Sequence, residues 1–531
     1  MTEQVERGVQ RIAEKITAGA PAGWAEAVLV SVQGQYGLHL SGRYTAAGAH
    51  PKLMHVPGAF ADLKEVTEAV GAARGWDSTR LEFRCRPSGE FAMTASRDTV
   101  SELHGARAGF QAVLDHGYRL SQPGLAQDEG TAAAAGDPDL AVARLRDHLQ
   151  RRAGILGRAE TLPPPVTTAE LDDAERRIGR PLPADLRAMY LVADGSGDDA
   201  PGLFGNLGWM PLARLVAANA DLREPVWSGW ENSWDTVVLD ADPPDTVRRC
   251  HGHPAWLPFA TADDGNYLAV DMSPAPAGRR GQVIQIGRDY SDGPVYVADS
   301  VTSLLGRYLE LLDRGAYAVE EDDPDFIDFL ETPSDPCPEY ELLADGIPHD
   351  VPATLQAVLI QFRAPTDPMD LTPLTAATRL RRLELKQRPT TDLTPLRALP
   401  VEALTVTLDG GDLAPLEGHR HLAFLDLATG TPVDITPLRT VPNLRCLDLS
   451  QADVRNLAVL ADLPDLRYLA LNGQQWTDLL DQGKLPTTLA AARLAGTGVS
   501  RDEALIWAER LGLDGGEPLH MTGTLAPGHS A

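Results

Sequence analysis

The most regular hydrophobic pattern in the chain lies between residues 370 and 472. A short motif, Asp-Leu-Thr-Pro-Leu or a close variant, begins at residues 370, 392, 412, 434 and 456, a repeat of 20 to 22 residues. Each motif is followed by the pattern apolar-x-x-apolar-x-apolar, as at Leu380, Leu383 and Leu385. Residues two positions apart share one face of a strand, and stacked strands bury a core that one repeat cannot. The pattern predicts five stacked repeats with parallel strands.

Each repeat begins with a residue that favours a turn. Asp370 and its counterparts are preferred helix N-caps, and Pro373 and its counterparts suit a first helical turn, where the missing N–H has no internal partner. We expect a cap, a short 3₁₀-like turn and then a strand. The blocks resemble the internalin-like class of leucine-rich repeats, which implies a solenoid.

The strand residues that alternate with the buried leucines should form the outward face of this solenoid. Phe424 and Tyr468 have no core reason to be aromatic at such positions, and Asp426 beside Asp448 adds a negative patch. We therefore expect a partner-binding surface; the alternative is a purely structural solenoid whose partner lies elsewhere. The candidate residues on this face are Arg382, Glu384, Lys386, Phe424, Asp426, Asp448, Tyr468 and Asn472.

Segments on either side of the repeats should close the ends of the array. The apolar residues between 355 and 362 predict an N-terminal capping strand. Ser500 and Glu503 form a capping box that opens a helix ending at Gly512, which should cover the last strand. We assign residues 346–512 to the solenoid with both caps and expect residues 513–531 to be a disordered tail.

The middle of the chain, residues 159–318, should be an α+β domain. Thr167 and Glu170 form a capping box, and several apolar strand patterns precede a final apolar helix after Ser300. The ordered segments Leu182-Pro-x-Asp-Leu186, Asp194-Gly195, Trp256-x-Pro-Phe-Ala260, Asp263-Asp-Gly265, Leu268-x-Val-Asp271 and Gly281-Gln-Val283 resemble the SUKH superfamily, which includes bacterial immunity proteins and fungal cell-wall-assembly regulators. The resemblance implies a domain that binds other proteins and has no known catalytic residues.

Residues 1–120 predict a small α+β domain. An amphipathic helix with Val5, Val9 and Ile12 on one face precedes two hairpin patterns and a second helix, and residues 103–120 should also be helical. The order resembles the small immunity-protein domains found beside bacterial toxin genes. We expect a linker and a helix over residues 121–158, and an acidic linker over 319–345.

An aromatic cluster between the predicted strands at residues 209–212 and 256–259 is a further candidate. Trp227, Trp230 and Trp234 lie among polar residues, where tryptophan often contributes much of an interface's binding energy. Packing at the edge of the domain's sheet is the alternative.

Charge and cysteine usage limit the function classes. A net charge of −28 argues against a general nucleic-acid binder and suits a basic partner. The N-terminus has no apolar signal region and no apolar run is long enough to cross a membrane. The four cysteines form no C-x-x-C pair, which favours a reducing, cytoplasmic compartment. Residue usage resembles that of a high-GC bacterium.

No motif indicates catalysis or a cofactor. Cys250, His251 and His253 are close together, but a zinc site needs a fourth ligand at patterned spacing, so we expect a loop. Asp263 and Asp264 are better explained by a turn than by a carboxylate pair. The sequence contains no nucleophile elbow, zinc-protease or phosphate-binding motif. We therefore expect no catalytic residues, no metal and no cofactor.

Taken together, the sequence predicts an α+β multidomain protein, with two α+β domains followed by a leucine-rich repeat solenoid. The resemblances imply a non-enzymatic immunity or antitoxin-type protein that neutralises a toxin or effector, plausibly a basic one, by direct binding. The alternative is a scaffold in cell-wall assembly or stress regulation. The sequence does not specify the oligomeric state.

Overall fold

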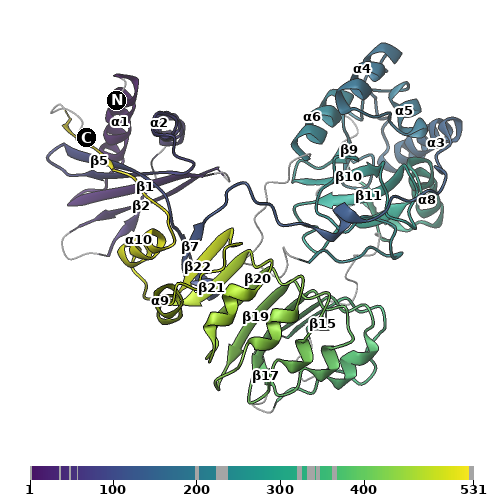
Figure 1. The fold of residues 1–531 in the computed structure, drawn as a ribbon. Helices are drawn as coiled ribbons and strands as arrows, with labels where there is room; N and C mark the ends of the chain where they lie inside the picture. The colour runs from purple at the N-terminus through teal and green to yellow at the C-terminus, as the bar shows by residue number, and fades with distance from the viewer. Residues whose placement is uncertain are drawn as a thin grey trace. The chain divides into compact units, whose positions relative to one another are not determined.

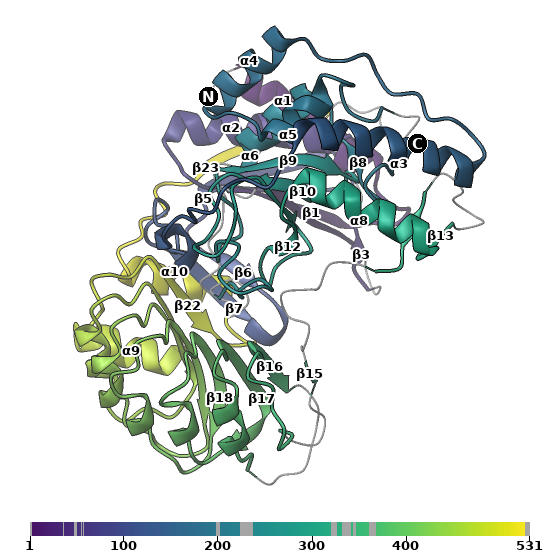
Figure 2. The ribbon, with the colours of Figure 1, turned by 90° about the vertical axis from the view of Figure 1, so that its right-hand side faces the viewer.

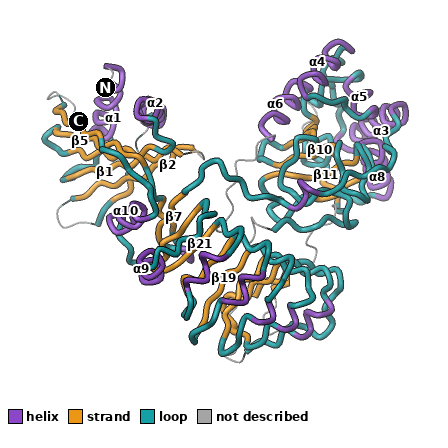
Figure 3. Tube along the Cα trace, viewed as in Figure 1, coloured by secondary structure: helices purple, strands orange, loops and turns teal. Residues whose placement is uncertain are grey.

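A computed structural model gives the architecture of the chain (Figure 1). It describes residues 3–34, 37–46, 50–54, 56, 58–197, 202–222, 237–319, 326–331, 341–342, 347–360 and 368–525. The chain divides into two compact units: residues 1–117 together with 469–531 (unit 1), and residues 118–468 (unit 2). Helices and strands occur in both units and the strands form several sheets (Figure 3). This confirms the mixed α and β, multidomain class.

Unit 1 contains a six-stranded sheet with two helices over one face (Figure 1). The apolar face predicted for the first helix is buried: Val9 and Ile12 are fully buried in the same core as Leu63 and Phe83. The strand order is β23-β5-β4-β1-β2-β3. The elements are α1 (Glu3–Ala18), β1 (Glu26–Gly34), β2 (Gly37–Thr45), β3 (Lys52–Leu53), α2 (Ala59–Arg74), β4 (Thr79–Cys85), β5 (Glu90–Arg97) and β23 (Leu519–Thr524).

The expectation of a disordered tail after residue 513 is wrong for residues 519–524. These residues form β23, which pairs antiparallel with β5 along its whole length, with Met521 opposite Met93. The amide of Leu525 continues the pairing by donating to the carbonyl of Gly89, at 2.9 Å. Without β23, β5 would be an edge strand with unpaired backbone groups, which invites aggregation. The C-terminal segment therefore completes the N-terminal sheet.

The helix expected over residues 103–120 is also absent. The structure instead has β6 (Ser101–Leu103), the 3₁₀ turn η1 (Gly105–Arg107) and β7 (Gly109–Val113). β7 pairs antiparallel with β22 (Ala491–Ala495), bringing Gly109 so close that a Cβ there would stand 2.2 Å from the carbonyl oxygen of Leu494. The φ angle of Gly109 is +140°, which side-chain-bearing residues rarely adopt. Pairing with a distant strand thus overrides the local helical pattern.

Two capped helices follow the last repeat strand, β21 (Tyr468–Asn472). Asn472 opens α9 (Gly473–Asp481) in a capping box with Gln475. Ser500 and Glu503 form the predicted capping box at the start of α10 (Arg501–Arg510). The side chain of Arg501 pairs with Asp98, which ties α10 to the segment before β6. The predicted capping helix therefore exists, and the sheet beyond β22 continues into β7 and β6.

In unit 2, residues 137–318 form a five-stranded antiparallel sheet covered by helices. The strand order is β12-β11-β10-β9-β8, and α3 and α8 run side by side against it (Figure 2). The elements are α3 (Pro138–Leu156), α4 (Thr168–Ile178), α5 (Ala184–Tyr190), β8 (Gly208–Trp209), α6 (Leu212–Leu222), β9 (Trp256–Thr261), β10 (Asn266–Asp271), β11 (Gln282–Gly287), β12 (Val295–Ala298), α8 (Val301–Arg314) and β13 (Tyr317–Ala318), paired with β14 (Asp328–Phe329).

One residue of the Leu-Pro-x-Asp-Leu segment holds two helices of this domain together. The Asp185 carboxylate is fully buried at the start of α5. Its Oδ2 accepts hydrogen bonds from both the backbone N–H and the hydroxyl of Thr302 in α8, each at 3.0 Å. A carboxylate at a helix start also suits the positive end of the helix dipole. The segment therefore fixes how α5 packs on α8.

The repeats of unit 2 form a parallel sheet, here called the repeat array. Leu383, Leu404, Leu425 and Leu447 stand opposite one another on successive strands and are fully buried. Figure 2 shows β16, β17 and β18 side by side. The elements are β15 (Glu341–Leu342), β16 (Ala357–Ile360), η3 (Thr372–Ala376), β17 (Arg382–Thr390), η4 (Thr394–Leu396), β18 (Ala403–Leu408), η5 (Ala414–Leu416), β19 (Phe424–Thr429), η6 (Thr436–Thr440), β20 (Cys446–Gln451) and η7 (Leu457–Asp462).

In the first four repeats the opening aspartate accepts from an N–H of the first turn, as predicted, although the N-cap itself is the next residue, such as Leu393. The carboxylate of Asp392 accepts from the backbone N–H of Thr394 at 2.8 Å, at the start of the 3₁₀ turn. Asp370, Asp412 and Asp434 make the same bond two residues on. The hydrogen bonds to the following threonine lower the pKa of Asp392. The turns are 3₁₀, with i→i+3 bonds such as that from the N–H of Leu396 to the carbonyl of Leu393, and η7 adopts the same form without a proline.

Removing β23 should destabilise unit 1. We expect a chain ending at Glu517 to melt several degrees below the full chain and to associate, because the β5 edge and its apolar neighbours become accessible. Differential scanning calorimetry and light scattering measure the two effects. A chain ending at Leu525, which keeps β23 whole, is the control. Equal melting temperature and equal mass for the two truncations would show that β23 contributes nothing to unit 1.

Candidate functional site

The structure buries most of the outward face that was expected to bind a partner. The exposed fraction of the residue is 1% for Arg382 and Glu384, 3% for Phe424 and 1% for Tyr468. The expectation of exposed aromatic side chains on this face is therefore wrong. Arg382 pairs with Asp292 of the five-stranded domain, so this part of the face is an internal contact of unit 2.

The remaining candidates have other positions. Asp426 and Asp448 are half-buried, and the Asp448 carboxylate accepts from the N–H of Ser450 at 2.9 Å. Asn472 is the N-cap of α9. Lys386 is in β17, but its side chain is not among those that the structure describes. Trp227, Trp230 and Trp234 lie entirely outside the described residues. The structure thus brings together no open surface from the candidates that it describes.

A buried carboxylate joins the repeat array to the five-stranded domain. Glu402, just before β18, accepts two hydrogen bonds from Nη2 of Arg249, at 2.7 and 2.6 Å. Nη1 of Arg381, on the preceding repeat, donates to the same carboxylate at 2.6 Å. Burial and the positive charge of Arg249 lower the pKa of Arg381. Two close guanidinium groups are tolerated in a buried site because the carboxylate lies between them.

Asp240 forms a second connection at the first strand of the array. Its backbone N–H and carbonyl exchange hydrogen bonds with the side-chain amide of Gln356, both at 2.8 Å. Its carboxylate pairs with Arg379 at 2.9 Å. Burial raises the pKa of Asp240, while the bond from the N–H of Asp245 opposes that rise. The loop between α6 and β9 is thereby fixed to the array.

The segment expected to be a linker, residues 121–137, also packs against this loop. The backbone N–H of Gly124, in the 3₁₀ turn η2 (Pro123–Ala126), donates to the carbonyl of Arg249 at 2.8 Å. The side-chain amides of Gln122 and Gln127 accept from the backbone N–H groups of His251 and Arg249. Nearby, the guanidinium of Arg467 lies 5.0 Å from the ring of Tyr118. The segment is therefore structured, and it contacts both the five-stranded domain and the array.

A cavity of about 530 Å³ opens in the five-stranded domain and is the strongest candidate site of unit 2. Its size is in the range of about 300–1,000 Å³ typical of ligand sites. Strands β10, β11 and β12, helix α8 and strand β14 all contribute to its wall. The lining residues are Phe204, Gly205, Asn206, Leu207, Leu268, Gln285, Tyr290, Val295, Val297, Tyr308, Asp328, Phe329 and Glu331.

Stacked aromatic rings form one wall of this cavity. The rings of Tyr308 and Phe329 are 4.4 Å apart and nearly parallel, and Phe204 lies 6.3 Å from Tyr308. Behind them the buried imidazole of His148 stacks on Tyr308 at 5.8 Å. Its Nε2 lies 3.0 Å from the carbonyl oxygen of Leu203, so Nε2 carries the proton and donates. The wall is rigid and apolar.

Carboxylates give the cavity a negative rim. The described lining residues include two carboxylates, Asp328 and Glu331, and Arg314 pairs with Glu331 at 2.9 Å. Burial raises the pKa of the Tyr308 hydroxyl, which therefore stays protonated at neutral pH. The described lining thus offers apolar contact, the amides of Asn206 and Gln285 and negative charge, and it includes no cationic side chain.

The residues with possible metal or catalytic chemistry have structural explanations. Cys250 is fully buried, and burial lowers the pKa of His251 and His253 to about 4. The Asp264 carboxylate accepts from the N–H of Asn266 at 2.9 Å, as the predicted turn requires. Within the described ranges, no three His, Cys, Asp or Glu side chains are grouped so that they could hold a metal ion. None of the described helices combines the length and apolar character needed to cross a membrane.

Residues 165–307 match the model of the SMI1/KNR4 family (SUKH-1), and this part of the chain is a SUKH domain. A glucan synthesis regulatory protein of Neurospora crassa is 42% identical over 29% of this chain and 35% of its own length. A cell wall biosynthesis/cell cycle regulator of Schizosaccharomyces pombe is 30% identical (30% and 33%), and a cell wall assembly regulator of Saccharomyces cerevisiae is 25% identical (31% and 39%). The chain thus spans little more than a third of these relatives.

Two solved structures that are similar to this chain are internalins of Listeria monocytogenes. Internalin C2 is 25% identical, with a TM-score of 0.19 over 22% of this chain and 52% of its own. An internalin named inlF is 18% identical, with a TM-score of 0.21 over 28% and 44%. The parallel register of β16 to β20 establishes the repeat fold of the array on its own.

Replacing Glu402 should destabilise unit 2. Glu402→Gln leaves Arg249 and Arg381 close together without their shared counter-charge, and removing one partner of a buried pair costs about 3 kcal/mol. Urea denaturation measures the free energy of unfolding. Glu417→Gln, at an exposed position of the next repeat, is the matched control. If both variants unfold at the same urea concentration as the wild type, the contact is not important for stability.

The stability of the SUKH domain should fall between pH 6.5 and pH 4. Burial lowers the pKa of His148 from its usual 6.5 to about 4. In this window the unfolded chain binds a proton that the folded chain does not, so the stability contribution of His148 rises with pH and is lost on acidification. The difference corresponds to about 3 kcal/mol.

Thermal denaturation across this pH range checks the expectation. His148→Phe keeps an aromatic ring beside Tyr308 but cannot titrate, so its melting temperature should depend less on pH than that of the wild type. His349→Phe, at an exposed position, should keep the wild-type slope. Identical slopes for all three proteins would contradict this role of His148.

Proposed function

We propose that this protein is a non-enzymatic regulator that binds a partner protein through the cavity of its SUKH domain. The observation that carries the proposal is the aromatic-walled, acid-rimmed cavity. Its lining combines residues of the segment that matches the SMI1/KNR4 family with Tyr308, Asp328, Phe329 and Glu331, which follow that segment. The chain's relatives are named as regulators of cell-wall and glucan synthesis. We extend that role to this chain as a proposal, since the chain covers little more than a third of the length of these relatives.

The chemistry of the cavity favours a partner segment with one large apolar side chain next to a basic residue. The ring pair of Tyr308 and Phe329 and the aliphatic wall at Val297 offer contact to an apolar group. Asp328 and Glu331 on the rim favour a positive neighbour. The net charge of −28 would speed the capture of a basic partner and make the association rate sensitive to salt.

The lining also supports a binding role over catalysis. Among its described residues there is no cysteine, serine, histidine or lysine, and Arg314 neutralises Glu331, one of the two carboxylates. The strongly negative charge supports a protein partner over nucleic acid. Cys85 and Cys250 are free and buried, in keeping with the reducing, cytoplasmic compartment that we propose.

The relatives favour the regulatory role over the immunity role. They are fungal proteins named for cell-wall assembly and glucan synthesis, so they give no support to a bacterial source or to toxin neutralisation. Affinity capture from the host, followed by identification of the retained proteins, separates the two. Enrichment of wall-synthesis or signalling proteins supports the regulatory role. Enrichment of a toxin, together with protection of cells that produce both the toxin and this protein, would support the immunity role instead.

A charge placed in the cavity should abolish partner capture. Phe329→Asp puts a carboxylate in the aromatic wall, and we expect at least a tenfold loss of the captured partner because an apolar side chain can no longer be buried there. Leu330→Asp, at the adjacent, 66% exposed position, is the control and should capture normally. Circular dichroism confirms that both variants fold. Equal capture by both would place recognition elsewhere on the chain.

A further inference from the structure

A groove borders the sheet of unit 1 where strand β2 meets helix α2; we call it the edge groove. Its volume is about 330 Å³, within the range of about 300–1,000 Å³ of ligand sites. Its described lining residues all belong to unit 1 and none to the SUKH domain, so an inference about this groove is independent of the function proposed above. They are Leu29, Leu40, Ser41, Gly42, Met54, Val56, Gly58, Ala59, Phe60 and Leu63.

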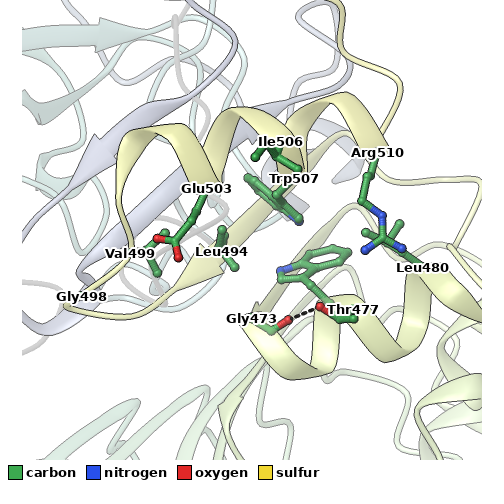
Figure 4. Close-up of a pocket in the computed structure, with 11 residues that line it drawn as sticks. Gly473, Thr477, Leu480, Leu494, Gly498, Val499, Glu503, Ile506, Trp507 and Arg510 are labelled. Atoms are coloured by element: carbon green, nitrogen blue, oxygen red, sulfur yellow. Dashed lines mark hydrogen bonds between the residues drawn. The ribbon is translucent and has the colours of Figure 1, made fainter.

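The edge groove leaves large apolar side chains open to solvent. Leu40 is 43% exposed and Phe60 is 54% exposed, and both line the same space. A hollow between α9 and α10 in the same unit is different (Figure 4). There the rings of Trp476 and Trp507 contact each other, with centroids 5.4 Å apart, so that the aromatic surfaces cover one another. The edge groove therefore has the open apolar surface that marks a contact site.

The edge of β2 beside this groove is only partly covered. β3 is two residues long and pairs with Arg43 and Tyr44. The N–H of Met54 then donates to the carbonyl of Gly42 at 2.9 Å, and the chain leaves the sheet to begin α2. Residues 38–41 of β2 therefore have β1 on one side and no described strand on the other.

This edge leaves backbone hydrogen-bonding groups unpaired. In an antiparallel ladder both backbone groups of a residue point to one side, and the side alternates along the strand. The carbonyl of Gly42 points away from β1, because it accepts from Met54, so the N–H and carbonyl groups of Leu38 and Leu40 point away from β1 as well. No described residue hydrogen bonds to these groups. Such an edge is a template for one more strand.

The register tells which side chains of an added strand would enter the groove. Leu38 and Leu40 lie on the face of β2 that α2 covers, whereas His39, Ser41 and Arg43 lie on the opposite face. Side chains alternate between the two faces of a sheet. Every second side chain of an added strand would therefore point into the edge groove, and the others would lie beside His39 and Arg43.

Positive charge borders the same edge. Arg43 in β2 and Lys52 in β3 are exposed, and no described carboxylate pairs with either of them. His39 is exposed as well. In a chain with a net charge of −28, this local excess of cations favours acidic residues in a strand that pairs here. A second copy of this chain would bring the same cations to the edge, so the charges favour a different partner.

We propose that the open edge of β2 binds an extended segment of a partner protein in which apolar residues alternate with acidic ones. The segment continues the sheet by hydrogen bonding to Leu38 and Leu40. Its apolar side chains enter the edge groove beside Phe60, and its acidic side chains lie on the opposite face, near Arg43. Main-chain bonds supply affinity in this mode of recognition, and the groove supplies selectivity.

The first test uses a synthetic heptapeptide of alternating glutamate and leucine, acetylated and amidated at its ends, with isothermal titration calorimetry on the full chain. We expect this peptide to bind, and the matched peptide of alternating lysine and leucine to bind about tenfold more weakly, because Arg43 and Lys52 repel it. The double variant Arg43→Glu, Lys52→Glu should reverse this preference, which a purely apolar contact would not do.

Methylated peptides distinguish strand addition from other contacts. In an extended peptide the leucine amides point to one edge and the glutamate amides to the other. N-methylation of one set removes the donors that pair with β2, whereas the methyl groups of the other set point away from it. We expect one of the two methylated peptides to lose about tenfold or more in affinity and the other to bind like the parent.

Protein variants test the groove itself. Phe60→Asp places a carboxylate at the mouth of the groove and should weaken the glutamate–leucine peptide about tenfold. Ile506→Asp, at a 61% exposed aliphatic position of the same unit, is the matched control and should bind normally. Circular dichroism and thermal denaturation check that both variants fold.

Four results would overturn the assignment. The first is that the glutamate–leucine peptide shows no binding at millimolar concentration. The second is that both methylated peptides bind as tightly as the parent, and the third is that Phe60→Asp binds as tightly as Ile506→Asp. The fourth is a dimer of the full chain in light scattering that dissociates in Phe60→Asp, since the occupant of the edge would then be a second copy.

Discussion

The arrangement of unit 2 depends on one buried carboxylate. Glu402 stands between Arg249 of the SUKH domain and Arg381 of the preceding repeat, and both guanidinium groups donate to it. Without the carboxylate, two positive charges would face each other in a site where side chains are almost fully removed from water. The two domains can pack here only because a repeat supplies an acid at the start of its strand.

This contact determines which surfaces remain for recognition. The outward face of a repeat array is the usual place for a partner, but Arg382 is occupied by Asp292 and the loop around Asp240 is fixed to the first strand. The array therefore functions as a platform for the SUKH domain within the same chain. The recognition site that we propose is instead the cavity on the other part of that domain, where Tyr308 and Phe329 form an apolar wall.

The local patterns of the sequence predicted local structure well. The leucine period, the aspartates that open the 3₁₀ turns and the boxes at Thr167 and Ser500 are all found, because each depends on residues within a few positions. Pairing between distant segments was not predictable. β23 lies more than 400 residues after β5 in the sequence. Its alternation of apolar and polar residues is weak, and it becomes a strand only because it pairs with β5.

The candidate site shows the same limit. The alternation of residues along each repeat strand predicted which face of the strand Phe424 and Tyr468 occupy. It did not predict which other segments cover that face and bury the two side chains. The SUKH cavity is assembled from residues between 204 and 331 that lie on strands, a helix and loops, and no spacing rule connects them. The resemblance to the family indicated the domain, whereas the position of its cavity required the fold.

Burial of polar atoms then separates structural sites from open ones. Glu402 and Asp185 are buried and fully engaged by donors of the same unit, so they hold elements together and have no capacity left for a ligand. Arg382 behaves in the same way, because its guanidinium is engaged by Asp292. The buried charged residues on the repeats therefore serve internal contacts of the fold. Capacity for a partner is better sought where aromatic side chains line a cavity, as Tyr308 and Phe329 do in the five-stranded domain.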